Sequence, residues 1–291
     1  MDASRALAAL PALPVLDRQS YLDKLREVVE PMVKIRAMYN SLVGGVVLEP
    51  ELMTVPIHDR AVNRGHACFD TCTLTGGRLY RLDIHLDRHL TSVSVARIRL
   101  PFEGGLEENR TRMRQVVAQT CVASGCRDAS VRFFTSAGPG SFAVLPDDCT
   151  SAFYVVILER PGGVPPPTAV PQGIAEYTVQ DVPLKPTLLA EIKSTNYMLN
   201  VLAAMSAQDR GGQFGIMLDA EGNIAEGSVK NCLFVDAERR LITPPFVDIL
   251  NGTTVRRVLQ LATTLVAEGL LTAVSQVRGT SFMWGCTLFL L

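Results

Sequence analysis

The chain has 291 residues, with 28 Lys or Arg against 29 Asp or Glu, so its formal net charge is −1. This balance argues against a broad basic surface for nucleic acid or anionic lipid, and any anionic ligand must be bound locally. Hydrophobic residues make up 47% and charged residues 20%, which excludes a disordered chain and provides enough apolar material for two modest domains.

Three features of the sequence bear on the compartment. No stretch approaches the ~18 uncharged apolar residues of a spanning helix, so no membrane contact is expected. The segment from Met1 to Val15 contains Asp2, Arg5 and two prolines, and it resembles neither a secretory signal nor an acid-free plastid transit segment. Seven cysteines without a CxxC pair argue against a disulfide framework and a zinc knuckle. We expect a cytoplasmic protein, with the plastid as the alternative.

The first half of the chain changes from helical to strand spacing. Apolar residues at helical intervals predict one amphipathic helix from Ser20 to Asn40. From Gly44 onward, short apolar runs between turn residues predict antiparallel strands, with a hairpin turn at Gly76-Gly77. A helix over residues 106–124 interrupts these strands, so this part is expected to be an α+β unit.

A proline-rich stretch divides the chain. Residues 161–171 contain five prolines and predict an interdomain linker. Before it we expect a small α+β domain over 41–160, behind an N-terminal extension and helix over 1–40. After it we expect a larger domain over 172–291, so the fold class of the whole chain is α+β / α/β.

The second half alternates helices with short strands. Helices are predicted from Thr195 to Gln208 and from Thr254 to Glu268, with strands over 215–227 and 232–244 between them. The first helix has an apolar face made of Met198, Val201, Leu202 and Met205.

Three polar features of this half each allow a structural and a chemical interpretation. Lys193 is either a solvated lysine or an amine whose pKa falls on desolvation, which can then bond an aldehyde. Glu226 is either a hairpin residue or a buried carboxylate that keeps a pyridinium nitrogen protonated. Thr253 and Thr254, after Gly252, either cap a helix or begin one that binds phosphate.

The order of these features resembles a known family. Lys193 is followed by Glu226 with Gly-Ser and Asn231, then by TPP at 243–245 and LNGTT at 250–254. Together with HLDRHL at 85–90 and DRAVNRGHACFDT at 59–71, this order resembles the class IV (fold-type IV) pyridoxal-phosphate aminotransferases. That family includes branched-chain and D-amino acid aminotransferases and aminodeoxychorismate lyase. The resemblance covers about residues 40–275.

Within the family, three motifs are most similar to the D-amino acid aminotransferase and lyase branch: SAGPGSF at 136–142, VPLKP at 182–186 and IKSTNY at 192–197. The resemblance implies pyridoxal 5′-phosphate as cofactor and a homodimer as the assembly. It also implies a fold with a small N-terminal domain and a larger cofactor-binding domain.

The resemblance assigns roles to individual residues. Lys193 would be the Schiff-base lysine and proton shuttle, and Glu226 would pair with the pyridine nitrogen. The remaining cofactor contacts would be Arg88, Thr253 and Thr254 at the phosphate and Tyr197 near the ring hydroxyl. On the substrate side, Phe69 would line the ring, and Arg132 would be either a carboxylate ligand or a structural ion pair.

The implied reaction moves an amino group from an amino acid, D-alanine being an example, to a 2-oxo acid. Alternatives are an aminodeoxychorismate lyase that releases pyruvate and 4-aminobenzoate, and a branched-chain amino acid aminotransferase. No metal is expected, because His85 and His89, spaced i and i+4, have no third ligand nearby.

The family pattern ends before the chain does. After about Ser275 the sequence QVRGTSFMWGCTLFLL matches no family segment, so the C-terminus is expected to be truncated relative to the family. The missing strands would leave a sheet edge and an apolar face of the second domain uncovered. A catalytically impaired, truncated homologue is therefore a further alternative.

Overall fold

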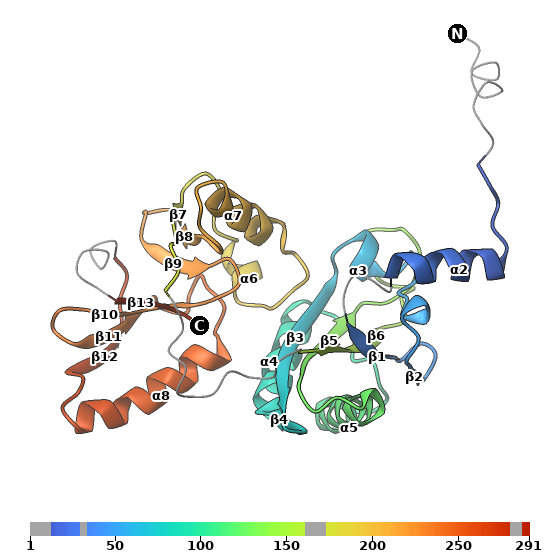
Figure 1. The fold of residues 1–291 in the computed structure, drawn as a ribbon, viewed down its shortest axis with the longest axis horizontal. Helices are drawn as coiled ribbons and strands as arrows, with labels where there is room; N and C mark the ends of the chain where they lie inside the picture. Colours follow the sequence, from blue (N-terminus) through green and yellow to red (C-terminus); the bar gives the residue numbers. More distant parts are fainter. Residues whose placement is uncertain (1–12, 30–33, 161–172, 280–286) are drawn as a thin grey trace, which may run out of the picture.

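The computed structural model describes residues 13–29, 34–160, 173–279 and 287–291. The predicted linker at 161–171 lies outside the described residues. Figure 1 shows the two halves of the chain as two lobes, with helix α4 of the first half turned toward the second. Each lobe contains both helices and strands, as expected for the α+β / α/β class.

The first lobe is built on a six-stranded antiparallel sheet in the order β2-β1-β6-β5-β3-β4. Strands β3 and β4 form the hairpin predicted at Gly76-Gly77. Helices α4 and α5 pack on this sheet over a core that includes Leu86, Met113 and Phe133. The elements are α2 (Arg18–Val29), β1 (Ile35–Asn40), β2 (Gly45–Val47), η1 (Pro50–Leu52), α3 (Arg60–Asn63), β3 (Ala67–Thr75), β4 (Arg78–Tyr80), α4 (Leu82–Val95), α5 (Leu106–Ser124), β5 (Ala129–Ser136) and β6 (Ala152–Glu159).

The predicted helix over 20–40 is wrong in its second half. Helix α2 ends at Val29, and residues 35–40 form strand β1, which pairs with β6 and β2. The apolar stripe of α2 buries no residue, whereas β1 has four consecutive buried residues. Residues 35–40 are therefore buried more fully as a strand of the sheet than they would be in a longer helix α2.

The second lobe contains two smaller sheets, in the orders β7-β8-β9 and β12-β11-β10-β13. Helix α8 packs on the four-stranded sheet over Leu233, Leu241 and Val255. The elements are β7 (Thr178–Val179), α6 (Thr187–Ala190), α7 (Met198–Gln208), β8 (Ile216–Leu218), β9 (Ile224–Gly227), β10 (Cys232–Val235), β11 (Arg240–Thr243), α8 (Thr253–Ala267), β12 (Ala273–Gln276) and β13 (Thr287–Leu290).

The last described residues add a strand to the four-stranded sheet of the second lobe. Strand β13 pairs antiparallel with β10 along its full length, from Val235↔Thr287 to Cys232↔Leu290. Leu288 and Leu290 pack against the buried cluster of the two small sheets. The uncharged tail therefore supplies both the hydrogen bonds and the apolar surface that the edge of β10 needs.

Helix α7 begins three residues later than predicted, at Met198. Its apolar face is solvent-exposed, and its buried residues are Asn200, Ala203 and Ala207. In the part of the chain that the structure describes, no helix is long and apolar enough to cross a membrane.

Candidate active site

The segment that carries Lys193 is held between the two lobes. Its backbone pairs with β3, because Phe69 N donates to Lys193 O at 2.8 Å and Thr195 N donates to Ala67 O at 2.9 Å. From the other side, Lys193 N donates to Ser92 Oγ of α4 at 3.1 Å. Because this segment pairs in an extended conformation, α7 begins at Met198 and not at Thr195. The same pairing fixes the backbone from which the Lys193 side chain projects.

The Lys193 amine lies among aromatic rings. Its Nζ donates to Tyr197 Oη at 3.2 Å and is 4.8 Å from the centroid of the Phe69 ring. Burial, together with the positive charge of Arg88, lowers the pKa of Lys193 to about 8. Since an ordinary lysine has a pKa of about 10.4, this amine is neutral, and therefore nucleophilic, at a much lower pH.

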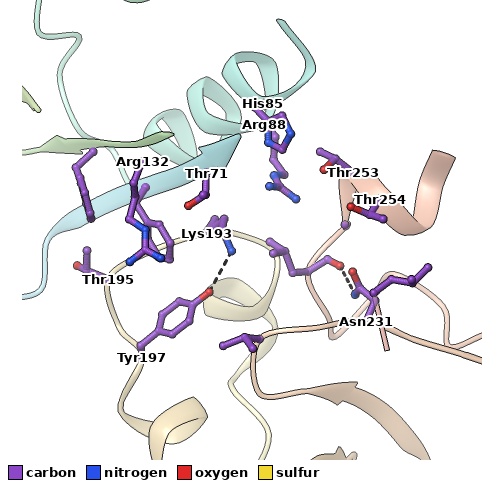
Figure 2. Close-up of a pocket in the computed structure, with 16 residues that line it drawn as sticks. Thr71, His85, Arg88, Arg132, Lys193, Thr195, Tyr197, Asn231, Thr253 and Thr254 are labelled. Carbon is purple, nitrogen blue, oxygen red and sulfur yellow. Dashed lines mark hydrogen bonds between the residues drawn. The ribbon is translucent and has the colours of Figure 1, made fainter. Parts of the chain in front are cut away.

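Arg88 points from α4 into the same space (Figure 2), and the buried carboxylate of Asp70 holds it there. Its Nε and Nη2 donate to the two oxygens of Asp70, each at 2.8 Å, and His85 contacts Asp70 Oδ1 at 2.9 Å. Burial alone would raise the pKa of Asp70, but the hydrogen bonds from His85 and Arg88 hold it well below its usual range. This bidentate ion pair fixes the orientation of the Arg88 guanidinium, and the N–H groups that do not bond Asp70 can bind an anion.

Helix α8 presents its N-terminus to Arg88. Arg88 Nη1 contacts Asn251 O at 3.5 Å, so α4 and the start of α8 lie side by side. Arg256 N donates to Gly252 O at 3.1 Å, and the amides of Thr253 and Thr254 precede this first helical bond. Free amides at a helix start next to an arginine make a favourable position for a phosphate group.

Gly252 is required by the packing at this helix start. A Cβ at this position would lie 1.9 Å from Asn231 Oδ1 and 3.1 Å from Val255 Cγ1. Asn231 cannot simply turn away, because it is buried and its Nδ2 donates to Leu250 O at 2.9 Å.

We therefore expect Gly252→Ala to destabilise the protein by roughly 1–3 kcal/mol through overpacking. Chemical denaturation measures this free energy of unfolding. Gly45→Ala is the matched control, because nothing lies within 4 Å of the added Cβ. Equal stabilities of the two variants would contradict the overpacking at Gly252.

Glu226 is buried behind the cavity wall. Its exposed fraction is 5%, and its carboxylate accepts a hydrogen bond from Leu250 N at 3.2 Å. Burial raises the pKa of Glu226 to about 7, although Lys185, the Leu250 amide and Lys193 oppose the shift. Leu250 lines the cavity, whereas Glu226 itself does not.

A cavity of about 600 Å³ brings the other candidates together. Arg132 projects from β5 toward the Lys193 side of this cavity (Figure 2), and among the described residues it has no ion-pair partner. The structural ion pair considered for Arg132 is therefore absent from this part of the chain. Seven of the eight predicted site residues line the cavity: Phe69, Arg88, Arg132, Lys193, Tyr197, Thr253 and Thr254.

Sequence reasoning misses three buried polar residues of this region: Asp70, His85 and Lys185. The spacing of His85 from His89 suggests only a metal ligand, and Lys185 is noted in the sequence only as part of the VPLKP motif. Asp70 could have been identified from the alternating pattern of strand β3. It stands at a core-facing position of that strand, where a buried carboxylate needs a hydrogen-bond or ion-pair partner. Within the described ranges, no three His, Cys, Asp or Glu side chains are grouped so that they could hold a metal ion.

Comparisons with known proteins agree with this arrangement. A D-amino-acid transaminase of Arabidopsis thaliana, described as chloroplastic, is 40% identical over 82% of this chain, and the match spans 61% of that relative's length. A bifunctional aminodeoxychorismate lyase / D-amino acid transaminase of Mycobacterium tuberculosis is 26% identical over 75% of this chain and 76% of its own.

Solved structures show the same fold. A branched-chain aminotransferase of the thermophilic archaeon Thermoproteus uzoniensis, crystallised with norvaline, superposes with a TM-score of 0.73 at 22% identity. The superposition covers 88% of this chain and 83% of that structure. The amino-transferase class IV family matches residues 67–275, from the start of β3 into β12. The protein therefore belongs to the class IV aminotransferase family.

Proposed function

We propose that this protein is a pyridoxal-phosphate-dependent aminotransferase that moves the amino group of a D-amino acid, such as D-alanine, to a 2-oxo acid. The observation that carries this proposal is Lys193, an amine of lowered pKa in one cavity with Arg88 and the start of α8. Membership of the family and the D-amino acid transaminase relatives support the choice of reaction and donor.

The residues present fit the polar groups of pyridoxal phosphate. Arg88, with Thr253 and Thr254 at a helix start, would bind the phosphate. Lys193 would bond the aldehyde carbon, and Tyr197, whose pKa burial raises to about 12, would face the ring hydroxyl as a protonated phenol. Glu226 would hold a proton at the pyridine nitrogen through its ionised carboxylate, because the positive ring nitrogen would offset the burial that raises its pKa to about 7.

The side chains then divide the work of the reaction. When bound, the cofactor supplies an electron sink for the bonds at the substrate Cα. Lys193 Nζ would take the proton from Cα and return it at the neighbouring cofactor carbon, while the 3.2 Å hydrogen bond to Tyr197 holds Nζ in place. Arg132, which has a free guanidinium in the described part of the chain, would bind the substrate carboxylate, and Phe69 would exclude water beside Nζ.

The lowered pKa of Lys193 predicts how covalent binding of the cofactor depends on pH. The rate at which the apoprotein bonds pyridoxal phosphate should rise as pH increases through about 8, because the neutral amine is the nucleophile. Stopped-flow absorbance measures this rate. Free Nα-acetyl-lysine, with a pKa of about 10.4, is the control, and the same midpoint for both would contradict the prediction.

A panel of amino donors tests the reaction. D-alanine should yield more than one equivalent of pyruvate per protein only when 2-oxoglutarate is present as acceptor. Pyruvate release from aminodeoxychorismate without an acceptor would establish the lyase instead, and preference for L-leucine would establish a branched-chain aminotransferase. Stable cofactor binding without turnover of any donor would mark a catalytically impaired homologue.

We also propose that two copies of the chain form a homodimer. The support is the outer face of α7, where Met198, Val201, Leu202 and Met205 are 42–70% exposed. Contiguous exposed apolar residues of this kind are typical of a protein interface. Sedimentation equilibrium measures the mass in solution, and a monomer at micromolar concentration would contradict the proposal.

A further inference from the structure

Ser92 joins the backbone of Lys193 to that of Arg88. Its Oγ accepts a hydrogen bond from Lys193 N at 3.1 Å and donates one to Arg88 O at 3.1 Å. Because Arg88 and Ser92 stand four residues apart on α4, they lie one above the other on the same face of that helix. The exposed fraction of Ser92 is 1%, so both bonds are shielded from solvent.

This hydroxyl connects the two halves of the chain at the candidate active site. Lys193 follows the predicted linker, whereas Arg88 and Ser92 precede it. The carbonyl of Lys193 bonds β3 instead, through Phe69 N at 2.8 Å. Within the described ranges, the bond to Ser92 is the hydrogen bond that ties the Lys193 segment to α4, the helix that carries Arg88.

The proposed function requires a fixed separation between Lys193 and Arg88. Lys193 would bond the aldehyde carbon and Arg88 would bind the phosphate, and both groups are attached to neighbouring carbons of one cofactor ring. Asp70 already orients the Arg88 side chain. The Ser92 hydroxyl restricts the remaining freedom, which is the position of the Lys193 backbone relative to α4. A displacement of about 1 Å between reacting groups is enough to lower a rate by about 100-fold.

We propose that Ser92 is a positioning residue that fixes Lys193 against the turn of α4 that carries Arg88, so that the amine lies within bonding distance of the aldehyde when the phosphate is bound. This inference rests on the proposed function. Ser92 does not line the cavity that contains Lys193, so it acts through the Lys193 backbone and not on the cofactor directly. Loss of its hydroxyl should therefore slow the covalent step and leave phosphate binding intact.

Stopped-flow absorbance of the apoprotein at increasing pyridoxal phosphate separates binding from bond formation. In Ser92→Ala, the first-order rate of bond formation at saturating cofactor should fall roughly 10- to 100-fold. Calorimetry should show an unchanged affinity for 4-deoxypyridoxine 5′-phosphate, which carries the phosphate but no aldehyde. The pH midpoint of the covalent step should stay near 8, because the charged groups around the amine are the same.

Further variants separate the hydroxyl from general stability. Ser92→Thr keeps a hydroxyl that can bond the carbonyl four residues earlier, and it should keep the rate of the unmodified protein. Ser92→Cys places a weaker acceptor in the same position and should give an intermediate rate. Thr120→Val is the matched control, because it removes a buried helical hydroxyl that donates to Val116 O at 2.7 Å in α5. It should leave the covalent step unchanged.

Three outcomes would overturn the inference. One is an equal rate of bond formation in Ser92→Ala and the unmodified protein. Another is a loss of analogue affinity in Ser92→Ala as large as its loss of rate, because that would show a general distortion of the site. The third is a Ser92→Thr variant as slow as Ser92→Ala.

Hydrogen exchange measured by NMR tests the tie without the cofactor. In the apoprotein the Lys193 amide should exchange about 10-fold faster or more in Ser92→Ala than in the unmodified protein, whereas the amides of α5 should be unaffected. Equal exchange of the Lys193 amide would overturn the tie itself. Faster exchange in Ser92→Ala, when the unmodified protein shows no cofactor band that depends on Lys193, would instead overturn the proposed function, and with it the positioning role of Ser92.

Discussion

Lys193→Ala is expected to lower kcat for transamination by roughly 10⁴-fold or more, because the proposed function gives this one side chain both the covalent attachment and the proton transfer. The cofactor absorbance that survives dialysis in the unmodified protein should disappear in the variant. The two readouts have one physical cause, since Lys193 Nζ is the amine of lowered pKa that lines the cavity. Absorbance spectra after dialysis and the D-alanine assay measure the two effects.

Lys230→Ala is the matched control for this prediction. Lys230 also contacts an aromatic ring, but it is only half-buried and does not line the cavity. We expect it to keep both the absorbance band and the activity. A band that persists in Lys193→Ala would show that another amine holds the cofactor, and the assignment of Lys193 would be wrong.

The candidate site could largely be predicted from the sequence because its residues stand in short motifs of fixed order. Lys193, Arg88 and the two threonines are far apart in the chain, yet they line one cavity. What the sequence could not reveal is the pairing that brings them together. The segment around Lys193 forms an extended connection to β3, and no local pattern distinguishes that connection from the first turn of a helix.

The fold is predictable where local periodicity and burial agree. Helix α5 coincides with the predicted range, and the β3–β4 hairpin forms at its glycine pair. Residues 35–40 are mistaken for helix because their spacing fits both structures, and only the open edge of β6 makes the strand the better choice. Strand β13 could not be foreseen for a related reason, since its partner β10 lies more than fifty residues earlier in the sequence.

Arg88→Ala is expected to destabilise the protein by about 3–5 kcal/mol at neutral pH, in addition to weakening phosphate binding. Asp70 is fully buried, and removal of the guanidinium leaves its carboxylate with His85 as its remaining side-chain hydrogen-bond partner among the described residues. An uncompensated buried charge of this kind is far more costly than the loss of an exposed ion pair. Chemical denaturation of the apoprotein measures the change without any contribution from the cofactor.

The pH dependence of this loss follows from the sign of the Asp70 shift. In the unmodified protein the pKa of Asp70 is held below its usual range, so its stabilising contribution is present above about pH 4 and is lost only as pH falls further. In Arg88→Ala the guanidinium no longer lowers the pKa of Asp70, and burial should raise that pKa. The folded variant should therefore favour the protonated form of Asp70. The stability difference between the two proteins should therefore shrink as pH falls from 7 toward 4.

Arg110→Ala is the control that separates a buried pair from an exposed one. Arg110 Nε bonds Asp87 Oδ1 at 2.6 Å, but the Asp87 side chain is 57% exposed, so the loss should not exceed about 1 kcal/mol. Arg88→Lys adds a second comparison, because it keeps the charge but loses the fork that holds both oxygens of Asp70. If Arg88→Ala costs no more than Arg110→Ala at neutral pH, Asp70 does not depend on Arg88, and the guanidinium is held by other contacts.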